Sequence, residues 1–405
     1  MLNDLDEQLA KRQLEGIVVF GDTTLGNPDL TYVVGGSLAR GGLYVKRTNH
    51  EALLVVSNLD IGTARRLGRV KRISTFTERR LEKIATKYGR ENAYPHLIKS
   101  ILRSEGITRG VSIAGRNDLA SSVHLADELR RLGTTVVGEV SPTVLESARE
   151  TKSRAEIEEV RRVGGKTATV VESVFDTLQN AKRKRARLYL GRTKATVGSV
   201  KRLISSKLAE EDLTTPEGTI FAIGASGADP HNAGNPSDTI KEGKLIVFDI
   251  FPQAGTGYWF DLTRSFVIGR ADAKSRNMFE TVRRAQNTTL DLLRVGITGE
   301  AVMLEACRVI EQAGYKTVRD VFEGRSKSIF SGFIHSLGHG VGLTIGERPN
   351  LSFLSRDPLK KGQIVTDEPG VYLPRYGGVR IEDTVAITGR GFENLASVDK
   401  QLELT

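Results

Sequence analysis

Four apolar segments that each contain a single key acid constrain this chain more than any other feature. They are KLIVFDIF, YWFDLTRSFVI, QIVTDEPGVYL and GGVRIEDTVAIT, and the acids are Asp249, Asp261, Glu368 and Glu382. Because β-branched and aromatic residues dominate, each segment is expected to form a strand that is at least half buried. PQAGTG, between the first two, has the proline and glycines of a connection between antiparallel neighbours. The chain is therefore predicted to place four carboxylates within strands of one domain.

Buried acids of this kind need compensation. An isolated buried charge is costly, so each carboxylate requires a cation, a proton or several hydrogen-bond donors. For Asp261 alone, an ion pair with Arg264 is an equally good explanation. Separate ion pairs explain less well why two histidines, His335 and His339, lie four residues apart at predicted glycine-rich turns of the same domain. Carboxylates with one imidazole form a hard ligand set that suits a pair of divalent manganese, cobalt, iron or zinc ions.

The two halves of the chain differ in their apolar pattern. Residues 1–148 alternate short β-branched runs, such as LEGIVVFG, GGLYVKR, EALLVVS and GVSIAG, with helical stretches, which predicts an α/β domain. Ser153 and Glu156 have the spacing of a capping box at the start of a long helix. The second domain, residues 149–405, is predicted to be α+β, with helices first and the acidic strands after them.

Composition excludes several classes of protein. No run approaches about 18 apolar residues, and MLNDLDEQLAKRQLEG at the start predicts a charged amphipathic helix rather than a secretory signal. Cys307 is the only cysteine, so no intrachain disulfide can form. GGKT at 164–167 and GASGA at 224–228 lack the spacing of a phosphate loop and a nucleophile elbow. These observations favour a cytoplasmic protein with no membrane partner and no serine or cysteine nucleophile.

Much of the net charge of +10 lies in one segment. Between Lys182 and Arg202 there are nine Lys/Arg residues and no acid. Tyr189 is the only aromatic residue there, and no nucleic-acid-binding module is recognisable, so the segment is interpreted as a solvated helix face with a loop. Nucleic acid is accordingly not expected as a partner.

The order Asp, Asp, His, Glu, Glu resembles that of the creatinase, aminopeptidase P and prolidase family. FDIFPQAGTGYWFDLTRSF resembles the family's two-aspartate hairpin, HSLGHGVGL its histidine segment and TDEPGVYLPRYGGVRIEDTVAIT its two-glutamate segment. The resemblance implies an α+β pita-bread catalytic domain at residues 149–405. It also implies that residues 1–148 form the creatinase-like α/β N-terminal domain of the family, and that the protein is a homodimer.

The resemblance assigns roles to individual residues. It implies that two divalent ions per chain are held by Asp249, Asp261, His339, Glu368 and Glu382. The implied catalytic set is Glu368 as acid and base, His335 and His231 in the substrate pocket, and Arg380 next to Glu382.

The reaction implied is hydrolysis of an Xaa-Pro bond, of the dipeptidase or aminopeptidase P type, by a hydroxide that bridges the two ions. The expected substrate is a peptide with proline in second position. Gly346 departs from the family pattern, because most members have a histidine there that is thought to touch the substrate carbonyl. Losing one such donor typically costs about 10²–10³ in rate, so ordinary peptidase efficiency is in question.

Two other functions remain open on the sequence alone. One is a metal-dependent member of the same family that acts on a small C–N substrate instead of a peptide. The other is a non-enzymatic relative that binds nucleic acid through residues 182–202. The complete set of five ligands counts against the second.

Overall fold

The chain divides into two compact units, Met1–Arg149 and Glu150–Thr405. The computed structural model describes residues 3–405. The helix predicted at the start is α1 (Asn3–Lys11), and the first two residues of that prediction lie outside the described part of the chain. Within residues 3–405, no helix combines the length and the apolar character that crossing a membrane requires.

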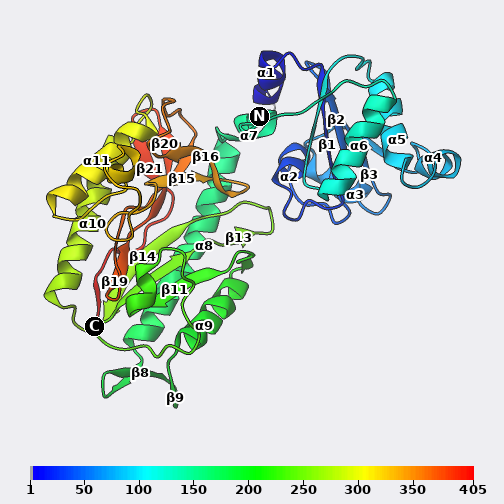
Figure 1. The fold of residues 1–405 in the computed structure, drawn as a ribbon. Helices are drawn as coiled ribbons and strands as arrows, with labels where there is room; N and C mark the ends of the chain where they lie inside the picture. The colour runs from blue at the N-terminus through cyan, green and yellow to red at the C-terminus, as the bar shows by residue number, and fades with distance from the viewer. Residues whose placement is uncertain (1–2) are drawn as a thin grey trace. The chain divides into compact units, whose positions relative to one another are not determined.

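The N-terminal unit is built on one six-stranded sheet in the order β4-β3-β2-β1-β5-β6 (Figure 1). Its strands are β1 (Gly16–Gly21), β2 (Gly42–Arg47), β3 (Leu53–Val56), β4 (Arg72–Thr75), β5 (Val111–Ala114) and β6 (Val136–Val137). Its other helices are α2 (Pro28–Val34), α3 (Ile61–Leu67), α4 (Leu81–Tyr88), α5 (Ala93–Ser104), α6 (Leu119–Arg131) and α7 (Val144–Arg149). The four runs predicted as strands are β1, β2, β3 and β5, so the α/β character of this unit is confirmed.

The C-terminal unit contains two larger sheets, in the orders β11-β12-β14-β22 and β16-β15-β17-β20-β21. The strands of the first are β11 (Thr219–Ile223), β12 (Leu245–Ile250), β14 (Leu262–Ile268) and β22 (Glu403–Leu404). Those of the second are β15 (Gly338–Val341), β16 (Ile345–Leu351), β17 (Ile364–Asp367), β20 (Asp383–Thr388) and β21 (Gly391–Asn394). The shorter strands are β7 (Lys182–Lys184), β8 (Arg187–Leu190), β9 (Thr193–Lys194), β10 (Leu213–Thr214), β13 (Gln253–Ala254), β18 (Gly370–Leu373) and β19 (Gly377–Arg380).

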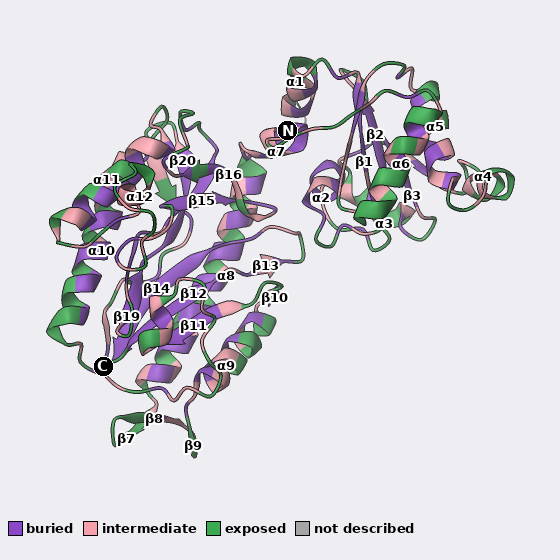
Figure 2. Cartoon of the chain, viewed as in Figure 1, coloured by how far each residue is buried: buried purple, intermediate pink, exposed green. Residues whose placement is uncertain are grey.

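Each larger sheet has its own pair of helices. The helices of this unit are α8 (Arg154–Gln179), α9 (Val197–Glu210), α10 (Ala273–Leu292), α11 (Gly299–Gln312), α12 (Arg319–Phe322) and the 3-10 helix η1 (Gly224–Ala228). Apolar residues of α8 and α9 pack on β11, β12 and β14, whereas α10 and α11 pack on strands of the second sheet (Figures 1 and 2). The faces that these helices leave uncovered supply the side chains of the site described below.

The long helix α8 begins where local chemistry predicts. The Ser153 side chain accepts a hydrogen bond from the Glu156 amide, and the Glu156 carboxylate accepts one from the Ser153 amide, so the predicted capping box is confirmed. GGKT lies inside this helix. A phosphate loop is therefore absent at that point of the chain.

The interpretation of the basic segment as a helix face with a loop is wrong for most of its length. Lys182 to Lys194 form the exposed three-stranded sheet β7-β8-β9, and only Val197 onward is helical. An isolated bridge between Arg187 and Lys241 ties this sheet to a distant segment. Pairing between strands, which local propensity does not reveal, therefore overrides the weak β preference of Lys and Arg.

The placement of the acids within continuous strands is also only partly right. Asp249 lies in β12, but Asp261 precedes β14, Glu368 falls between β17 and β18, and Glu382 falls between β19 and β20. Pro369 lacks an amide donor, which explains the break in the ladder after Glu368. At strand ends, side chains leave the regular alternation of a sheet and can point to a common centre. His339 is likewise not in a turn but in strand β15.

Candidate metal centre

A single cavity of about 480 Å³ in the C-terminal unit collects all the residues predicted for catalysis and metal binding. They are His231, Asp249, Asp261, His335, His339, Glu368, Arg380 and Glu382. β12 and β14 pair antiparallel without a register shift, which brings Asp249 opposite Thr263. Thr263 in turn forms an isolated bridge to Glu382, so the two larger sheets meet at the acids.

His339 is placed by the close approach of strand β15 to its neighbours. A Cβ atom on Gly338 would lie 2.0 Å from the Thr366 carbonyl oxygen, and one on Gly340 would lie 2.5 Å from the Arg348 carbonyl oxygen. Larger residues are therefore excluded on either side of the histidine. The glycines allow the backbone to pack tightly enough for the His339 ring to reach the acids.

The His339 ring presents one nitrogen to two carboxylates. Nε2 lies 3.6 Å from Asp261 Oδ2 and 3.5 Å from Glu368 Oε1, which is too long for good hydrogen bonds. Nδ1 lies 3.1 Å from the Gly340 carbonyl oxygen and 3.3 Å from the Gly346 amide nitrogen, two contacts that require opposite protonation of Nδ1. The shorter contact is the more favourable, and a carbonyl only accepts. Nδ1 then carries the proton, as in most metal-bound histidines, and Nε2 offers its lone pair.

Three acids of the cluster are buried, and each has one oxygen without a protein partner. Asp249 Oδ2 accepts from Arg380 Nη2, and Glu382 Oε2 accepts from Thr263 Oγ1 at 2.7 Å. Asp249 Oδ1, Asp261 Oδ1 and Glu382 Oε1 are buried without a hydrogen bond. Such orphaned anionic oxygens are costly in a protein interior, where nearly all polar atoms are paired.

The pKa values and the net charge of the cluster also favour bound cations. Burial raises the pKa of Asp261, Glu368 and Glu382 above their ordinary values, and repulsion among the neighbouring carboxylates raises it further. Four carboxylates face one guanidinium, that of Arg380, which gives a net charge of −3. The residues therefore fit bound cations well, because added positive charge would satisfy the orphaned oxygens and stabilise the ionised carboxylates together.

The alternative of an Asp261–Arg264 ion pair is wrong. The Arg264 guanidinium pairs with Asp383 at 2.7 Å and also donates to the carbonyl oxygens of Val398 and Glu382. It thus holds the backbone next to Glu382 and leaves the Asp261 carboxylate to the cluster. Ligand atoms of Asp261, His339 and Glu382 lie within 4.8 Å of one another, a spacing at which a single ion could contact all three.

Tyr372 is one of the residues of the site that the sequence did not reveal. Its hydroxyl accepts from Arg380 Nη1 at 2.7 Å and lies 2.9 Å from His335 Nε2. His335 Nδ1 lies 2.7 Å from the Ser336 carbonyl oxygen and must donate to it, so Nε2 accepts from the tyrosine. Burial lowers the pKa of His335 to about 3 and raises that of Tyr372 to about 12, so both side chains are neutral near pH 7.

A second chain of bonds connects Arg380 to Glu382. Arg380 Nε donates to Thr263 Oγ1 at 3.2 Å, and that hydroxyl donates to Glu382. The only sequence signal for Thr263 and Tyr372 was their place near the acids in the same apolar segments. Which strand faces which, and hence which hydroxyl meets Arg380, depends on tertiary pairing.

In this domain the ends of several strands bring four carboxylates and His339 together in one cavity. Such a site is typical of metal-dependent hydrolases. The sequence model of Metallopeptidase family M24 matches residues 158–389, which is more than half of the chain. The chain belongs to metallopeptidase family M24, and the predicted resemblance to the creatinase, aminopeptidase P and prolidase family is confirmed.

Similar proteins come from bacteria and archaea. The Xaa-Pro dipeptidase of Pyrococcus furiosus is 37% identical over 184 residues, which cover 45% of this chain and 48% of that protein. The Xaa-Pro dipeptidase of Lactobacillus helveticus is 33% identical over 189 residues, or 46% of each chain. These sequence matches span about half of the length of the curated relatives.

The fold extends further than the sequence similarity. The prolidase from Pyrococcus horikoshii OT3 matches 99% of both chains with a TM-score of 0.74 at 24% identity. The Xaa-Pro dipeptidase from Bacillus anthracis matches 99% of this chain and 98% of that one with a TM-score of 0.77 at 20% identity. The predicted pita-bread fold is thereby confirmed for the chain.

Proposed function

We propose that this chain is a dinuclear-metal peptidase that hydrolyses Xaa-Pro bonds. The observation that carries the proposal is the cluster of four carboxylates and His339, with three buried anionic oxygens lacking any partner. Asp249, Asp261, His339, Glu368 and Glu382 hold the ions. One dication would leave part of the net charge of −3 uncompensated, and two would slightly exceed it. A pair of ions of manganese, cobalt, iron or zinc suits this ligand set.

The substrate class follows from the relatives. Two relatives, 37% and 33% identical to this chain over 184 and 189 residues, are Xaa-Pro dipeptidases. A peptide with proline in second position is therefore the proposed substrate. In this proposal residues 1–148 are the creatinase-like N-terminal domain and residues 149–405 the catalytic domain.

Divalent ions bound there supply Lewis acidity, which polarises a carbonyl group and lowers the pKa of a coordinated water. Glu368 is the proton carrier. Its carboxylate lies 3.5 Å from His339 Nε2, at the centre of the proposed ion site, where it can take up and release a proton during the reaction. It accepts the proton of the water whose oxygen attacks the carbonyl carbon, and delivers it to the proline nitrogen as the C–N bond breaks.

Arg380, Tyr372 and His335 are positioning residues in this mechanism. Arg380 fixes Asp249 directly and Glu382 through Thr263, so each acid keeps one oxygen turned to the centre of the cavity. Both ring nitrogens of His335 are engaged, which leaves it no free donor for the substrate. His231 is exposed and lines the cavity, so it is the histidine available to a bound peptide.

The test is hydrolysis of Ala-Pro and of Pro-Ala by protein loaded with Mn²⁺ or Co²⁺ and by protein treated with a chelator. Cleavage of Ala-Pro alone, lost with the chelator and restored by metal, is the expected result. No cleavage of Ala-Pro or longer Xaa-Pro peptides, with metal demonstrably bound, would reject the peptide as substrate.

A further inference from the structure

Lys201 also lines the cavity, although it belongs to helix α9 on the far side of the sheet. Apolar residues of α9 belong to one cluster with Phe221 and Phe248, whereas Ile220 and Val247 belong to a separate small cluster. β11 is the edge strand of this sheet. Lys201 reaches over that edge, and its ammonium group donates to the Thr219 carbonyl oxygen at 2.9 Å.

The register of β11 places this ammonium group beside the metal centre. Ile220, next to Thr219, is the direct partner of Asp249 across the β11–β12 ladder. Neighbouring strands are about 4.8 Å apart, so the Thr219 carbonyl lies within about two strand spacings of Asp249. Lys201, Ile220 and the acids of the metal cluster therefore line one cavity.

The ammonium group of Lys201 is only partly used by the protein. Within residues 3–405 its ammonium group makes no ion pair, and one backbone carbonyl uses one of its three donors. Burial lowers the pKa of Lys201 below its ordinary value. The other cation of the cavity, Arg380, donates to Asp249, Tyr372, Thr263 and the Pro230 carbonyl oxygen. Lys201 therefore keeps two N–H groups for a bound molecule, whereas most of the Arg380 donors are already used.

We infer that Lys201 binds a carboxylate group of the substrate, an assignment that rests on the proposed function. A carboxylate accepts charge-assisted hydrogen bonds from the two remaining N–H groups and supplies the missing counter-charge. Ile220, Phe251 and Ile345 form apolar parts of the cavity lining that suit the hydrocarbon portion of a short peptide.

Two carboxylates of an Xaa-Pro peptide fit this chemistry. One is the free C-terminal carboxylate of a dipeptide, which would make the enzyme selective for dipeptides. The other is the side chain of an acidic residue that precedes proline. Ala-Pro compared with Ala-prolinamide isolates the first source, and Glu-Pro compared with Gln-Pro isolates the second.

The experiment measures kcat/KM for these four peptides with the metal-loaded wild type, Lys201→Met, Lys201→Arg and Lys207→Met. Lys207 lies on the same helix but pairs with Glu210, so Lys207→Met is the matched control. In Lys201→Met, the preference for the carboxylate-bearing member of one pair should fall about 10- to 100-fold, mainly through KM, because a hydrogen bond to a charged group is lost. Lys201→Arg should retain most of the preference.

The inference is overturned if Lys201→Met changes neither preference by more than Lys207→Met does. A wild type that cleaves none of the four peptides would instead reject the proposed function. In that case, calorimetry should measure the affinity of the same peptides for wild type and Lys201→Met, which tests carboxylate binding by Lys201 without any cleavage. If the carboxylate-bearing peptide of each pair were preferred equally by the two proteins, the role of Lys201 would be overturned.

Discussion

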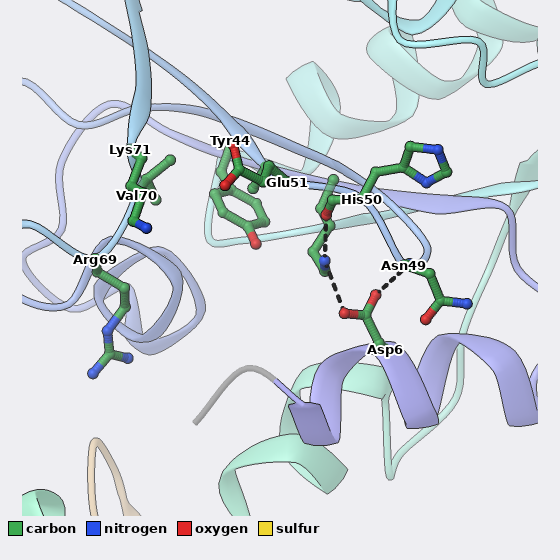
Figure 3. A pocket seen from close by; sticks show the side chains of 10 residues that line it. Asp6, Tyr44, Asn49, His50, Glu51, Arg69, Val70 and Lys71 are labelled. Atoms are coloured by element: carbon green, nitrogen blue, oxygen red, sulfur yellow. Dashed lines mark hydrogen bonds and ion pairs between the residues drawn. The ribbon is translucent and has the colours of Figure 1, made fainter.

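Each unit of the molecule contains a pocket of nearly the same volume, about 470 Å³ in the N-terminal unit and about 480 Å³ in the C-terminal unit. In the N-terminal pocket an acid is paired with a base. Asp6 accepts from Lys46 at 3.0 Å and from the Asn49 amide at 2.7 Å, and Lys46 also donates to the His50 carbonyl at 2.7 Å (Figure 3). In the C-terminal pocket the acids face one another.

The two pockets have nearly the same volume, so volume does not distinguish the functional one. Their charge balance does. Two acids and three bases line the first pocket, giving +1 with neutral histidine, and five acids and two bases line the second, giving −3. Opposite charges in direct contact compensate each other, so they require no bound ion. Like charges in a buried site are stable only with a proton or a cation, and this requirement marks the second pocket as the functional one.

The largest effect is expected from removing one acid of the C-terminal pocket. Asp261→Asn or Glu382→Gln should lower bound metal and reduce Xaa-Pro hydrolysis by more than about 100-fold, since losing even an outer partner of a metal ligand costs 10–100-fold. Asp6→Asn, which breaks the Asp6–Lys46 pair, is the matched control and should change neither quantity. Metal content by mass spectrometry and kcat/KM on Ala-Pro are the measurements. An equal loss from Asp6→Asn would erase the contrast between the pockets.

The metal-free protein should lose stability as the pH rises. The pKa of Glu368 is raised to about 8 in the folded state, and those of Asp261 and Glu382 are also raised. Groups of this kind contribute stability that is complete below about pH 4.5 and is lost as the pH rises through the folded pKa. Tm of metal-free protein should therefore fall between about pH 6.5 and 8, above the range in which the lowered pKa of His335 acts in the opposite direction, by about 2–4 °C for each kcal/mol lost.

Bound metal should remove this trend, because the cations stabilise the ionised carboxylates. Differential scanning calorimetry with and without Mn²⁺ provides the comparison. A metal-free Tm that rises with pH over this window would show that the carboxylates are compensated within the protein itself.

Much of the site was predictable because its signals are local. An acid within an apolar segment, or a histidine between glycines, is visible in a few residues of sequence, and so is the capping box of Ser153 and Glu156. The strands β4 and β6 were missed because RIST is short and partly polar and Val136–Val137 contains only two residues. The exposed sheet β7-β8-β9 was missed because pairing, not apolar periodicity, holds it.

The supporting residues were not predictable for a different reason. Tyr372 meets Arg380 only because β18 and β19 pair with Gly370 opposite Arg380. Lys201 reaches the cavity only because β11 is an edge strand. Both facts are properties of the tertiary arrangement, so no short stretch of sequence contains them.

Two fully buried tyrosines, one at each pocket, give a matched pair of variants. Tyr372→Phe removes the hydroxyl between Arg380 and His335 and should lower kcat/KM about tenfold with metal retained, the loss expected from one hydrogen bond to a charged group. Tyr44→Phe removes a buried hydroxyl without a partner and should leave activity intact and stability equal or slightly higher. Similar activities of the two variants would mean that the Tyr372 contacts are incidental.

The smallest effect is expected at Gly346. Space is available, since no atom lies within 4 Å of a Cβ built there, but its φ of +77° is unfavourable for other residues by about 1–2 kcal/mol. Gly346→His should therefore raise turnover on Ala-Pro by less than about tenfold, well below the 10²–10³ that one such donor can contribute. Gly346→Ala is the control, because it introduces the same backbone strain without an imidazole. A gain of 10² or more would show that the missing imidazole limits the wild type.

The most direct test of the account is a crystal structure of the protein equilibrated with Mn²⁺, with data collected for anomalous scattering. We predict two anomalous peaks per chain within the C-terminal pocket, in contact with Asp249, Asp261, His339, Glu368 and Glu382. None is expected in the N-terminal pocket, where Asp6 is already paired with Lys46. Peaks confined to other sites, or the five side chains in place with no ion among them at saturating Mn²⁺, would contradict this prediction.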